Sequence, residues 1–277
     1  MEGIEGLLHR YRTAALKRIQ KYGSVATLRG DFEVGEESIS FAADPGCETF
    51  NDDFVAVWKP SEAGAIHWAA AIADGVTGSL LAQEAAELAC YLGLAAIANR
   101  DRRSSISGNP IAFTTRIFHQ IGRQIVAAPE AFVPAGCPKS IWQVSAREGK
   151  FLQTTLNLVW STNEGLRVMA VGDGGLLYSY AANPDQFTGH TFGSGKLECL
   201  GPRSALVQPE AYLLENWSGL ACHTDGMAAT IEELNDFPEM LFDRNQCVSS
   251  VIEGLNRDHP ELVDDNLSAF CVSRLVK

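Results

Sequence analysis

Six aspartates of this sequence lie where a run of apolar, β-type residues begins or ends: Asp52, Asp53, Asp74, Asp173, Asp225 and Asp265. Glycine directly follows three of them, at Asp74, Asp173 and Asp225. Because glycine lets the backbone turn sharply, an Asp-Gly pair at a strand end can present both a carboxylate and a backbone carbonyl to one ion. A single Asp-Gly pair is more often a simple turn. The repetition at several strand ends is what indicates a site.

Oxygen ligands of this kind suit hard divalent cations. Mg²⁺ and Mn²⁺ take carboxylates, carbonyls and waters in octahedral shells. The seven cysteines are scattered and form no CxxC pair, and no group of His and Cys has the spacing of a zinc site. The cysteine pattern is typical of reduced thiols in a reducing compartment. The sequence therefore predicts a hard-cation site in a cytoplasmic protein.

The overall charge excludes one class of partner. The 277 residues include 22 Lys and Arg against 34 Asp and Glu, a net charge of −12. Binding to nucleic acid needs a basic surface, so no nucleic-acid partner is expected. The first 22 residues carry charges throughout, which excludes a signal peptide or a membrane span there, and no membrane partner is expected. The sequence does not predict the oligomeric state.

Short β-type runs and longer helical patterns alternate in blocks along the chain. We expect strands at residues 37–43, 53–58, 66–73, 152–160, 166–171, 176–180, 205–214, 219–222 and 267–276. We expect helices at residues 79–99, with Ser79 as N-cap, and at 111–127, 227–234 and 237–255. Residues 128–150, with three prolines and little periodicity, are predicted to be irregular, either a flap over the site or a surface loop.

The order of these elements predicts the fold class. Strands occur in runs and helices in pairs, which favours antiparallel sheets covered by helices over βαβ units. We therefore expect an α+β protein, a four-layer α/β/β/α sandwich. Residues 1–30 are interpreted as an N-terminal helical extension and 31–277 as the domain that carries the six aspartates. The amphipathic pattern of the extension favours packing against the domain, and a partner-binding arm is the alternative.

Six segments carry a specific resemblance. In order they are FNDDFVAV, AIADGVTGS, LQTTLNLVW, MAVGDGGLLYSY, CHTDGMAATI and DDNLSAFCVSRL, between about Phe50 and Phe270. Each segment alone is weak, but their order and spacing resemble the successive motifs of the metal-dependent protein phosphatase family (protein phosphatase 2C), in its bacterial type. The resemblance implies two antiparallel sheets flanked by helix pairs, with metal ions at one edge.

The resemblance also implies roles for individual residues. Asp74 would bridge two ions, with the Gly75 carbonyl as a further ligand. Asp225 and Asp265 would hold the first ion, and Asp52 the second. Asp53 would orient waters on the ions, so that Asp53 and Asp74 are the expected catalytic residues, and Asp173 would serve a third ion found in some members.

The activity implied is that of a Mn²⁺- or Mg²⁺-dependent serine/threonine phosphoprotein phosphatase, a hydrolase that acts on a phosphorylated protein. A water between two divalent ions is acidified towards neutral pH and attacks the phosphomonoester without a protein nucleophile. Two other functions stay open: an inactive regulatory or binding module that keeps the fold, and a phosphatase for a small phosphorylated metabolite.

Three positions depart from the family pattern. Glu48 stands where many members have an arginine that binds the substrate phosphate, and Arg29, Arg103 and Lys139 are the candidate replacements. Val76 stands where some eukaryotic members have a general-acid histidine, which bacterial relatives also lack. Gly174 replaces the serine that usually follows the aspartate at position 173. His223 and the five tryptophans are interpreted as structural.

Overall fold

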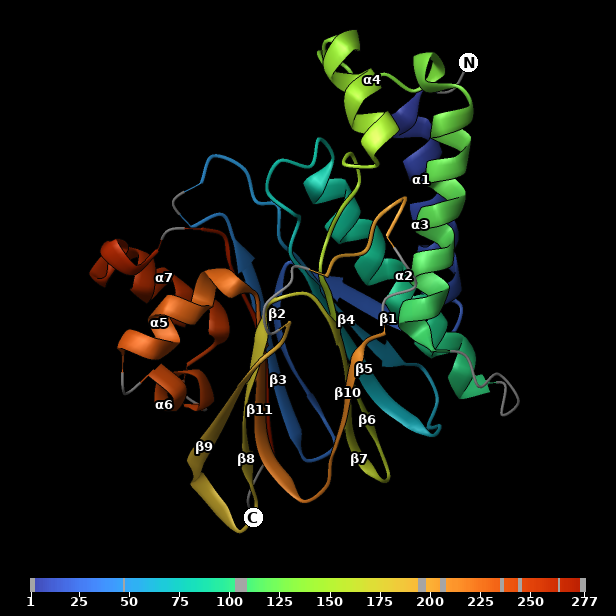
Figure 1. The fold of residues 1–277 in the computed structure, drawn as a ribbon. Helices are drawn as coiled ribbons and strands as arrows, with labels where there is room; N and C mark the ends of the chain where they lie inside the picture. Colours follow the sequence, from blue (N-terminus) through green and yellow to red (C-terminus); the bar gives the residue numbers. More distant parts are fainter. Residues whose placement is uncertain are drawn as a thin grey trace.

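Two antiparallel sheets packed face to face form the centre of the protein. The computed structural model describes residues 3–46, 48–102, 109–193, 198–204, 208–234, 237–243, 246–263 and 265–274. The first sheet has the strand order β1-β4-β5-β6-β7-β10 and the second β2-β3-β12-β11-β8-β9, and helices cover the outer face of each (Figure 1). The predicted four-layer α+β sandwich is confirmed.

The strands pair with their sequence neighbours in most places. In the first sheet they are β1 (Gly23–Thr27), β4 (Phe54–Pro60), β5 (Ile66–Ala73), β6 (Leu156–Thr162), β7 (Gly165–Val171) and β10 (Glu210–Leu214). In the second they are β2 (Arg29–Val34), β3 (Glu37–Asp44), β12 (Leu267–Arg274), β11 (Trp217–His223), β8 (Gly175–Tyr180) and β9 (Asn183–Thr191). Strands β4 and β5 pair antiparallel as a hairpin, with Phe54 opposite Ala73.

Two groups of helices form the outer layers. The first group comprises α1 (Ile4–Gln20), α2 (Ala82–Arg102), α3 (Pro110–Ala127) and α4 (Lys139–Glu148), and the second α5 (Ala228–Glu233), α6 (Phe237–Phe242) and α7 (Val248–Asp258). Three short 3₁₀ helices, η1 (Pro129–Ala131), η2 (Asp225–Met227) and η3 (Pro260–Leu262), lie in the connections. No helix in the described part of the chain has both the length and the apolar character that a membrane span needs.

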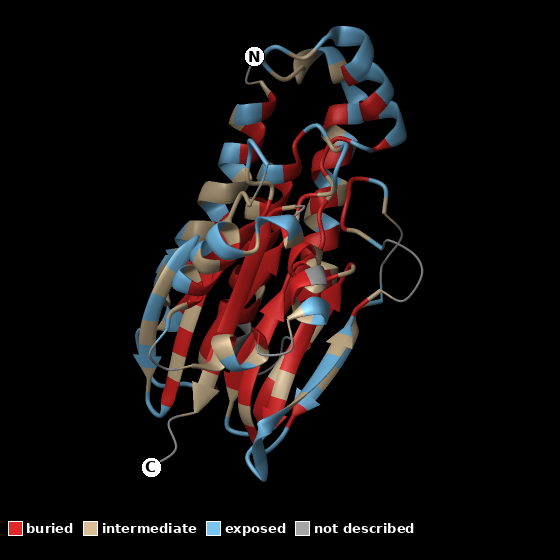
Figure 2. Cartoon of the chain, turned by 90° about the vertical axis from the view of Figure 1, so that its left-hand side faces the viewer, coloured by how far each residue is buried: buried red, intermediate tan, exposed pale blue. Residues whose placement is uncertain are grey.

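The core consists of three apolar clusters, one between each pair of adjacent layers. Strands β4 and β5 are buried along most of their length because helices cover one face and the second sheet covers the other. Figure 2 shows the buried residues on these central strands and the exposed ones on the outer edges. Two-sided burial explains why β4 and β5 are continuous apolar runs in the sequence.

The N-terminal helix packs on the first helical layer, as its amphipathic pattern predicts. Its buried residues are Ile4, Leu7, Leu8, Ala15 and Ile19, which join the same apolar cluster as α2 and the first sheet. Arg12 on α1 also forms an ion pair with Glu87 on α2. Helix α1 is therefore part of the folded unit.

Several sequence predictions of secondary structure were wrong. Strands β1, β2 and β9 were not predicted, since each is exposed on alternate or most residues and carries little apolar signal. Helix α2 begins at Ala82 and Ser79 is not its N-cap, because the Ser79 hydroxyl accepts a hydrogen bond from the Gln153 amide (3.1 Å). The single helix predicted at 237–255 is two helices, α6 and α7.

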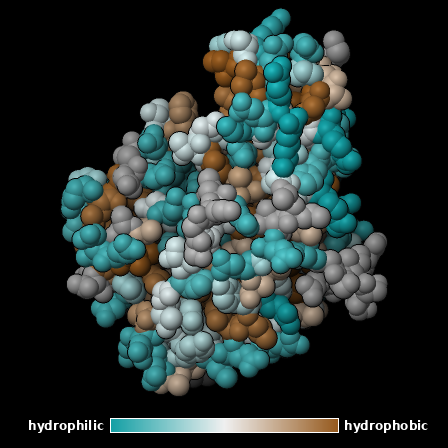
Figure 3. Space-filling model, in the orientation of Figure 1, coloured by the Kyte–Doolittle hydropathy of each residue, from teal (hydrophilic) through white to brown (hydrophobic). Residues whose placement is uncertain are grey.

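The segment 128–150 was also predicted wrongly as irregular, since it contains η1 and α4. Trp142 anchors α4, fully buried against Phe151, and its Nε1 donates to the Pro129 carbonyl (2.7 Å). Ile141 and Val144 lie on the outside of this helix, and apolar side chains are visible at that end of the molecule in Figure 3. The predicted strand at 205–214 exists from Glu210, and residues 205–207 lie outside the described part of the chain.

The packing of α1 gives a stability prediction. Replacing Leu7 by Ala removes a fully buried side chain and leaves a cavity, which should lower the free energy of unfolding by about 2–5 kcal/mol. Urea denaturation followed by circular dichroism measures this. The exposed Lys17→Ala on the same helix should change stability by less than about 0.5 kcal/mol. Equal stability of the two variants would show that α1 does not pack on the domain.

Candidate metal centre

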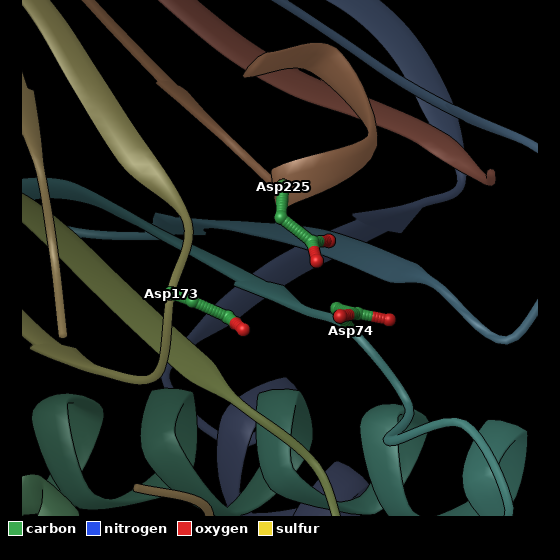
Figure 4. Close-up of side chains that lie close together, drawn as sticks. All are labelled: Asp74, Asp173 and Asp225. Atoms are coloured by element: carbon green, nitrogen blue, oxygen red, sulfur yellow. The ribbon is translucent and has the colours of Figure 1, made fainter. Parts of the chain in front are cut away.

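Three aspartates converge where the two sheets meet at one edge. Asp74 follows β5, Asp173 lies in the turn between β7 and β8, and Asp225 begins η2, separated from the end of β11 by one residue. Each offers a carboxylate oxygen, and these oxygens lie within 4.8 Å of one another. Figure 4 shows the three side chains pointing into one shared space from separate segments of chain. The tertiary structure thus brings together the three Asp-Gly aspartates of the sequence.

Asp53 is the most deeply buried of the six aspartates, with 2% of its surface exposed. Its Oδ2 accepts a hydrogen bond from the Thr224 hydroxyl (2.9 Å), next to Asp225. Its Oδ1 is buried and has no hydrogen-bond donor among the described residues. Buried polar atoms are almost always paired, so this oxygen indicates a missing partner such as a cation or a water held by one.

Asp52 and Asp265 lie beside the three-carboxylate cluster and are joined through Asn266. The Asn266 Oδ1 accepts a hydrogen bond from the Asp52 amide, and the Asn266 backbone amide donates to Asp265 Oδ1 (2.8 Å). The Asn266 side chain also donates to the carbonyls of Pro45 and Phe50 (3.2 and 3.3 Å). Asn266 therefore fixes the loop that carries Asp52 against the loop that carries Asp265.

Two threonines hold the backbone of Asp74. The Thr154 hydroxyl and the Thr155 amide both donate to the Asp74 carbonyl (2.7 and 2.8 Å), and the Thr155 hydroxyl accepts from the Asp74 amide (3.0 Å). The Gly75 amide donates to the Asp52 carbonyl (3.2 Å) and so ties the two acidic loops together. The roles of Asn266, Thr154 and Thr155 were not identified from the sequence, although all three lie within the quoted segments.

Close backbone contacts explain two of the glycines. A Cβ added at Gly226 would lie 2.1 Å from the Asn266 carbonyl oxygen, and one at Gly75 would lie 2.6 Å from the backbone of Ala82. Any larger residue would push apart the segments that bear Asp225 and Asp265, or Asp74 and α2. The glycines of these two Asp-Gly pairs are therefore required by packing.

Burial, followed by repulsion between the carboxylates, raises the pKa values of the acidic side chains at this edge. Burial, followed by the charges of Asp53 and Asp225, raises the pKa of Asp74, and burial likewise raises the pKa of Asp53. The pKa of Asp225 is raised by burial and then by Asp173 and Asp265. No ion pair joins these carboxylates to a lysine or arginine in the described part of the chain. The donor set and its uncompensated charge fit one or more hard divalent cations.

Glu48 and the cations considered as replacements for the phosphate-binding arginine lie at separate places in the structure. Glu48 is exposed and close enough to Asp52 to contribute to its raised pKa, after burial and Asp265. Arg29 pairs with Glu253 (3.2 Å) and lies 3.9 Å from Asp44, Lys139 begins α4, and Arg103 lies outside the described residues.

His223 is buried at the end of β11, and its Nδ1 donates to the Thr224 carbonyl (2.9 Å). Burial lowers the pKa of this histidine. A buried neutral imidazole that bonds to the adjacent backbone agrees with the structural interpretation of His223.

Without metal, the carboxylates of this edge should make stability depend on pH. Folding raises the pKa values of these carboxyl groups. Their contribution to the free energy of unfolding is therefore complete below the ordinary carboxyl pKa of about 4, and it is lost as pH rises through the pKa values of the folded state. In chelator, the melting temperature should therefore fall between about pH 6 and about pH 8.5. Added Mn²⁺ should reverse the fall.

Asp74→Asn is the control for this measurement, because it removes one of the charges. In chelator this variant should melt higher than the unaltered protein at the upper pH and show a weaker pH dependence. A melting temperature in chelator that rises with pH would contradict the assignment.

Comparisons with known proteins agree with this geometry. A sequence model of the family described as Protein phosphatase 2C matches residues 47–270, a span that includes the six aspartates. No curated protein matches the sequence at a significant level.

Solved structures match almost the whole chain. A serine/threonine phosphatase Stp1 from Staphylococcus aureus is 13% identical, with a TM-score of 0.59 and coverage of 86% of this chain and 95% of that one. A bacterial serine phosphatase is 13% identical (TM-score 0.57; 86% and 97% covered). RsbX in complex with magnesium is 12% identical (TM-score 0.56; 89% and 100%). At these identities the neighbours show a shared fold. The family model, whose match spans most of the chain, shows that the protein belongs to the protein phosphatase 2C family.

Proposed function

We propose that this protein is a Mn²⁺- or Mg²⁺-dependent phosphatase that acts on phosphoserine or phosphothreonine in proteins. The observation that carries the proposal is the convergence of Asp74, Asp173 and Asp225 beside a buried Asp53 oxygen that lacks a donor among the described residues. The neighbours named as serine/threonine phosphatases support the substrate class, and the neighbour solved with magnesium supports the metal class. The free thiols of the described cysteines suit a reducing compartment such as the cytoplasm.

The carboxylates would share the ions according to their positions. Asp74 lies close enough to both Asp53 and Asp225 for their charges to raise its pKa, and this central position suits a ligand that bridges two ions. Asp225 and Asp265 would be further ligands of one ion. Asp52 and the Gly75 carbonyl would be ligands of the other ion, and Asp173 together with Asp225 would hold a third. Two bound ions supply a water acidified towards neutral pH and a positive field for the phosphate.

The protein's own groups orient the reaction. The Thr224 hydroxyl holds Asp53 by Oδ2, which would leave Oδ1 to accept a hydrogen bond from a water at the centre and so orient it. Thr154 and Thr155 fix the backbone of Asp74 and therefore the point from which its carboxylate projects. Electrostatic stabilisation of this kind depends on groups that are already in place before the reaction.

The first test is phosphate release from p-nitrophenyl phosphate and from a phosphothreonine peptide with Mn²⁺, with Mg²⁺ and with chelator. Turnover should need metal, and Asp225→Ala should lower kcat/KM by on the order of a hundredfold or more because it removes a ligand of two ions. Asp185→Ala, at an exposed position of β9, is the matched control and should retain activity.

The position of Glu48 supports a second function. An exposed acid beside Asp52, where an arginine would bind phosphate, adds repulsion for an anionic substrate. A regulatory module would bind Mn²⁺ in calorimetry without hydrolysing either substrate, and that result would refute the phosphatase proposal. Hydrolysis of small phosphoesters alone would indicate a metabolite phosphatase instead.

A further inference from the structure

A cationic groove lies on the helical layer that covers the first sheet, outside the cluster of aspartates. A groove of about 640 Å³ runs between α3 and the segment that ends at Ser204. Arg116, His119 and Arg123 line it from α3, at the spacing that places them on one face of the helix, and Arg203 lines it from the other side. Figure 1 shows this segment, in orange, beside α3, in green. No acidic residue of the described chain lines the groove.

Close contacts build the far wall of this groove. The His119 Nε2 donates to the Ser204 carbonyl (2.6 Å), and a Cβ added at Gly122 would lie 2.5 Å from the Pro202 side chain. The Ser204 hydroxyl closes the turn by accepting from the Gly201 amide (3.1 Å) and donating to the Gly201 carbonyl (3.0 Å). The turn that carries Arg203 is therefore held against α3.

The arginines of the groove have no acidic partner among the described residues. Arg123 and Arg203 are exposed, and neither forms an ion pair within that part of the chain. Arg116 donates through Nε to the Ala112 carbonyl, on its own helix (3.3 Å). In a chain with 34 acidic residues and a net charge of −12, this is the reverse of the prevailing charge. Planar guanidinium groups match the geometry of carboxylates.

The groove is linked to the metal centre through a short path. Three residues before Arg203, Leu200 exchanges two backbone hydrogen bonds with Thr154 (2.8 and 3.0 Å), and Thr154 in turn pairs with Gly75. From Arg203 to Leu200 the chain can extend over at most three residues, and the steps from Leu200 to Thr154 and from Thr154 to Gly75 each add one distance between paired Cα atoms. Together these distances give an upper limit of about 22 Å between the Cα atoms of Arg203 and Gly75. An extended peptide covers this distance in about seven residues.

We propose that this groove binds acidic side chains of a phosphoprotein substrate, within about seven residues of the phosphorylated residue, while the phosphate lies at the metal centre. This inference rests on the proposed phosphatase function and names its substrate class. The groove offsets the repulsion that Glu48 imposes on an anionic substrate, since it supplies positive charge at a separate point of the same chain.

The experiment compares two phosphothreonine peptides with the full chain and Mn²⁺ at low ionic strength. One peptide carries glutamates about four to seven residues from the phosphothreonine, on both sides, and the other carries glutamine at the same positions. The wild-type protein should hydrolyse the acidic peptide with a kcat/KM higher by about tenfold. The double variant Arg123→Gln/Arg203→Gln should lose this preference through KM, with p-nitrophenyl phosphate hydrolysis unchanged.

The control is Lys17→Gln/Arg18→Gln on α1, which removes the same charge from an exposed helix outside the groove. It should keep the preference. Equal hydrolysis of the two peptides by the wild type, or an equal loss in both double variants, would overturn the groove assignment and leave the phosphatase intact.

An absence of turnover on every substrate would instead refute the phosphatase proposal. In that case the anisotropy of a labelled acidic peptide still decides the assignment. Weaker binding to the groove variant than to the control supports the groove, and equal binding overturns it.

Discussion

The repulsion among buried carboxylates is the constraint on which the rest of this structure depends. Buried Asp53 and the partly buried Asp74 and Asp225 are brought together with no cation from the described part of the chain to offset them. Isolated buried charge is costly, so the surrounding packing must hold these groups in place. The hydrogen bonds from Thr154, Thr155 and Thr224, and the close approach at Gly226, are the means by which it does so.

The sandwich supplies these restraints because the acidic residues lie at the beginnings or ends of deeply anchored strands. β5 is buried on both faces and ends directly before Asp74, and β11 is buried between β8 and β12 and ends before Thr224 and Asp225. Since the ends of strands in two packed sheets meet at one edge, rigid strands place flexible carboxylates within ligand distance. The strands that form the core therefore also position the site, and α1 supports them through its packing on α2.

Charge is distributed unevenly over this acidic protein in a way that concerns its substrate. The loop at Glu48 adds negative potential beside Asp52, whereas Arg116, Arg123 and Arg203 concentrate positive potential on the helical side. A phosphate held by metal ions does not need an arginine at the position of Glu48 if the remainder of the substrate is held elsewhere. Complementary charges far from the reacting atoms contribute more to the selection of a partner than to the affinity for it.

The sequence by itself determined the layer architecture and the acidic residues. Two-sided burial makes β4 and β5 continuous apolar runs, and the recurrent Asp-Gly pairs at strand ends lie in motifs whose order is specific. Tertiary structure alone decided the rest. The edge strands β1, β2 and β9 owe their pairing to neighbours rather than to their own apolar content, and α4 is fixed by Trp142 docking on Phe151. Asn266 and the arginine groove depend on contacts between residues far apart in the chain, which no local pattern encodes.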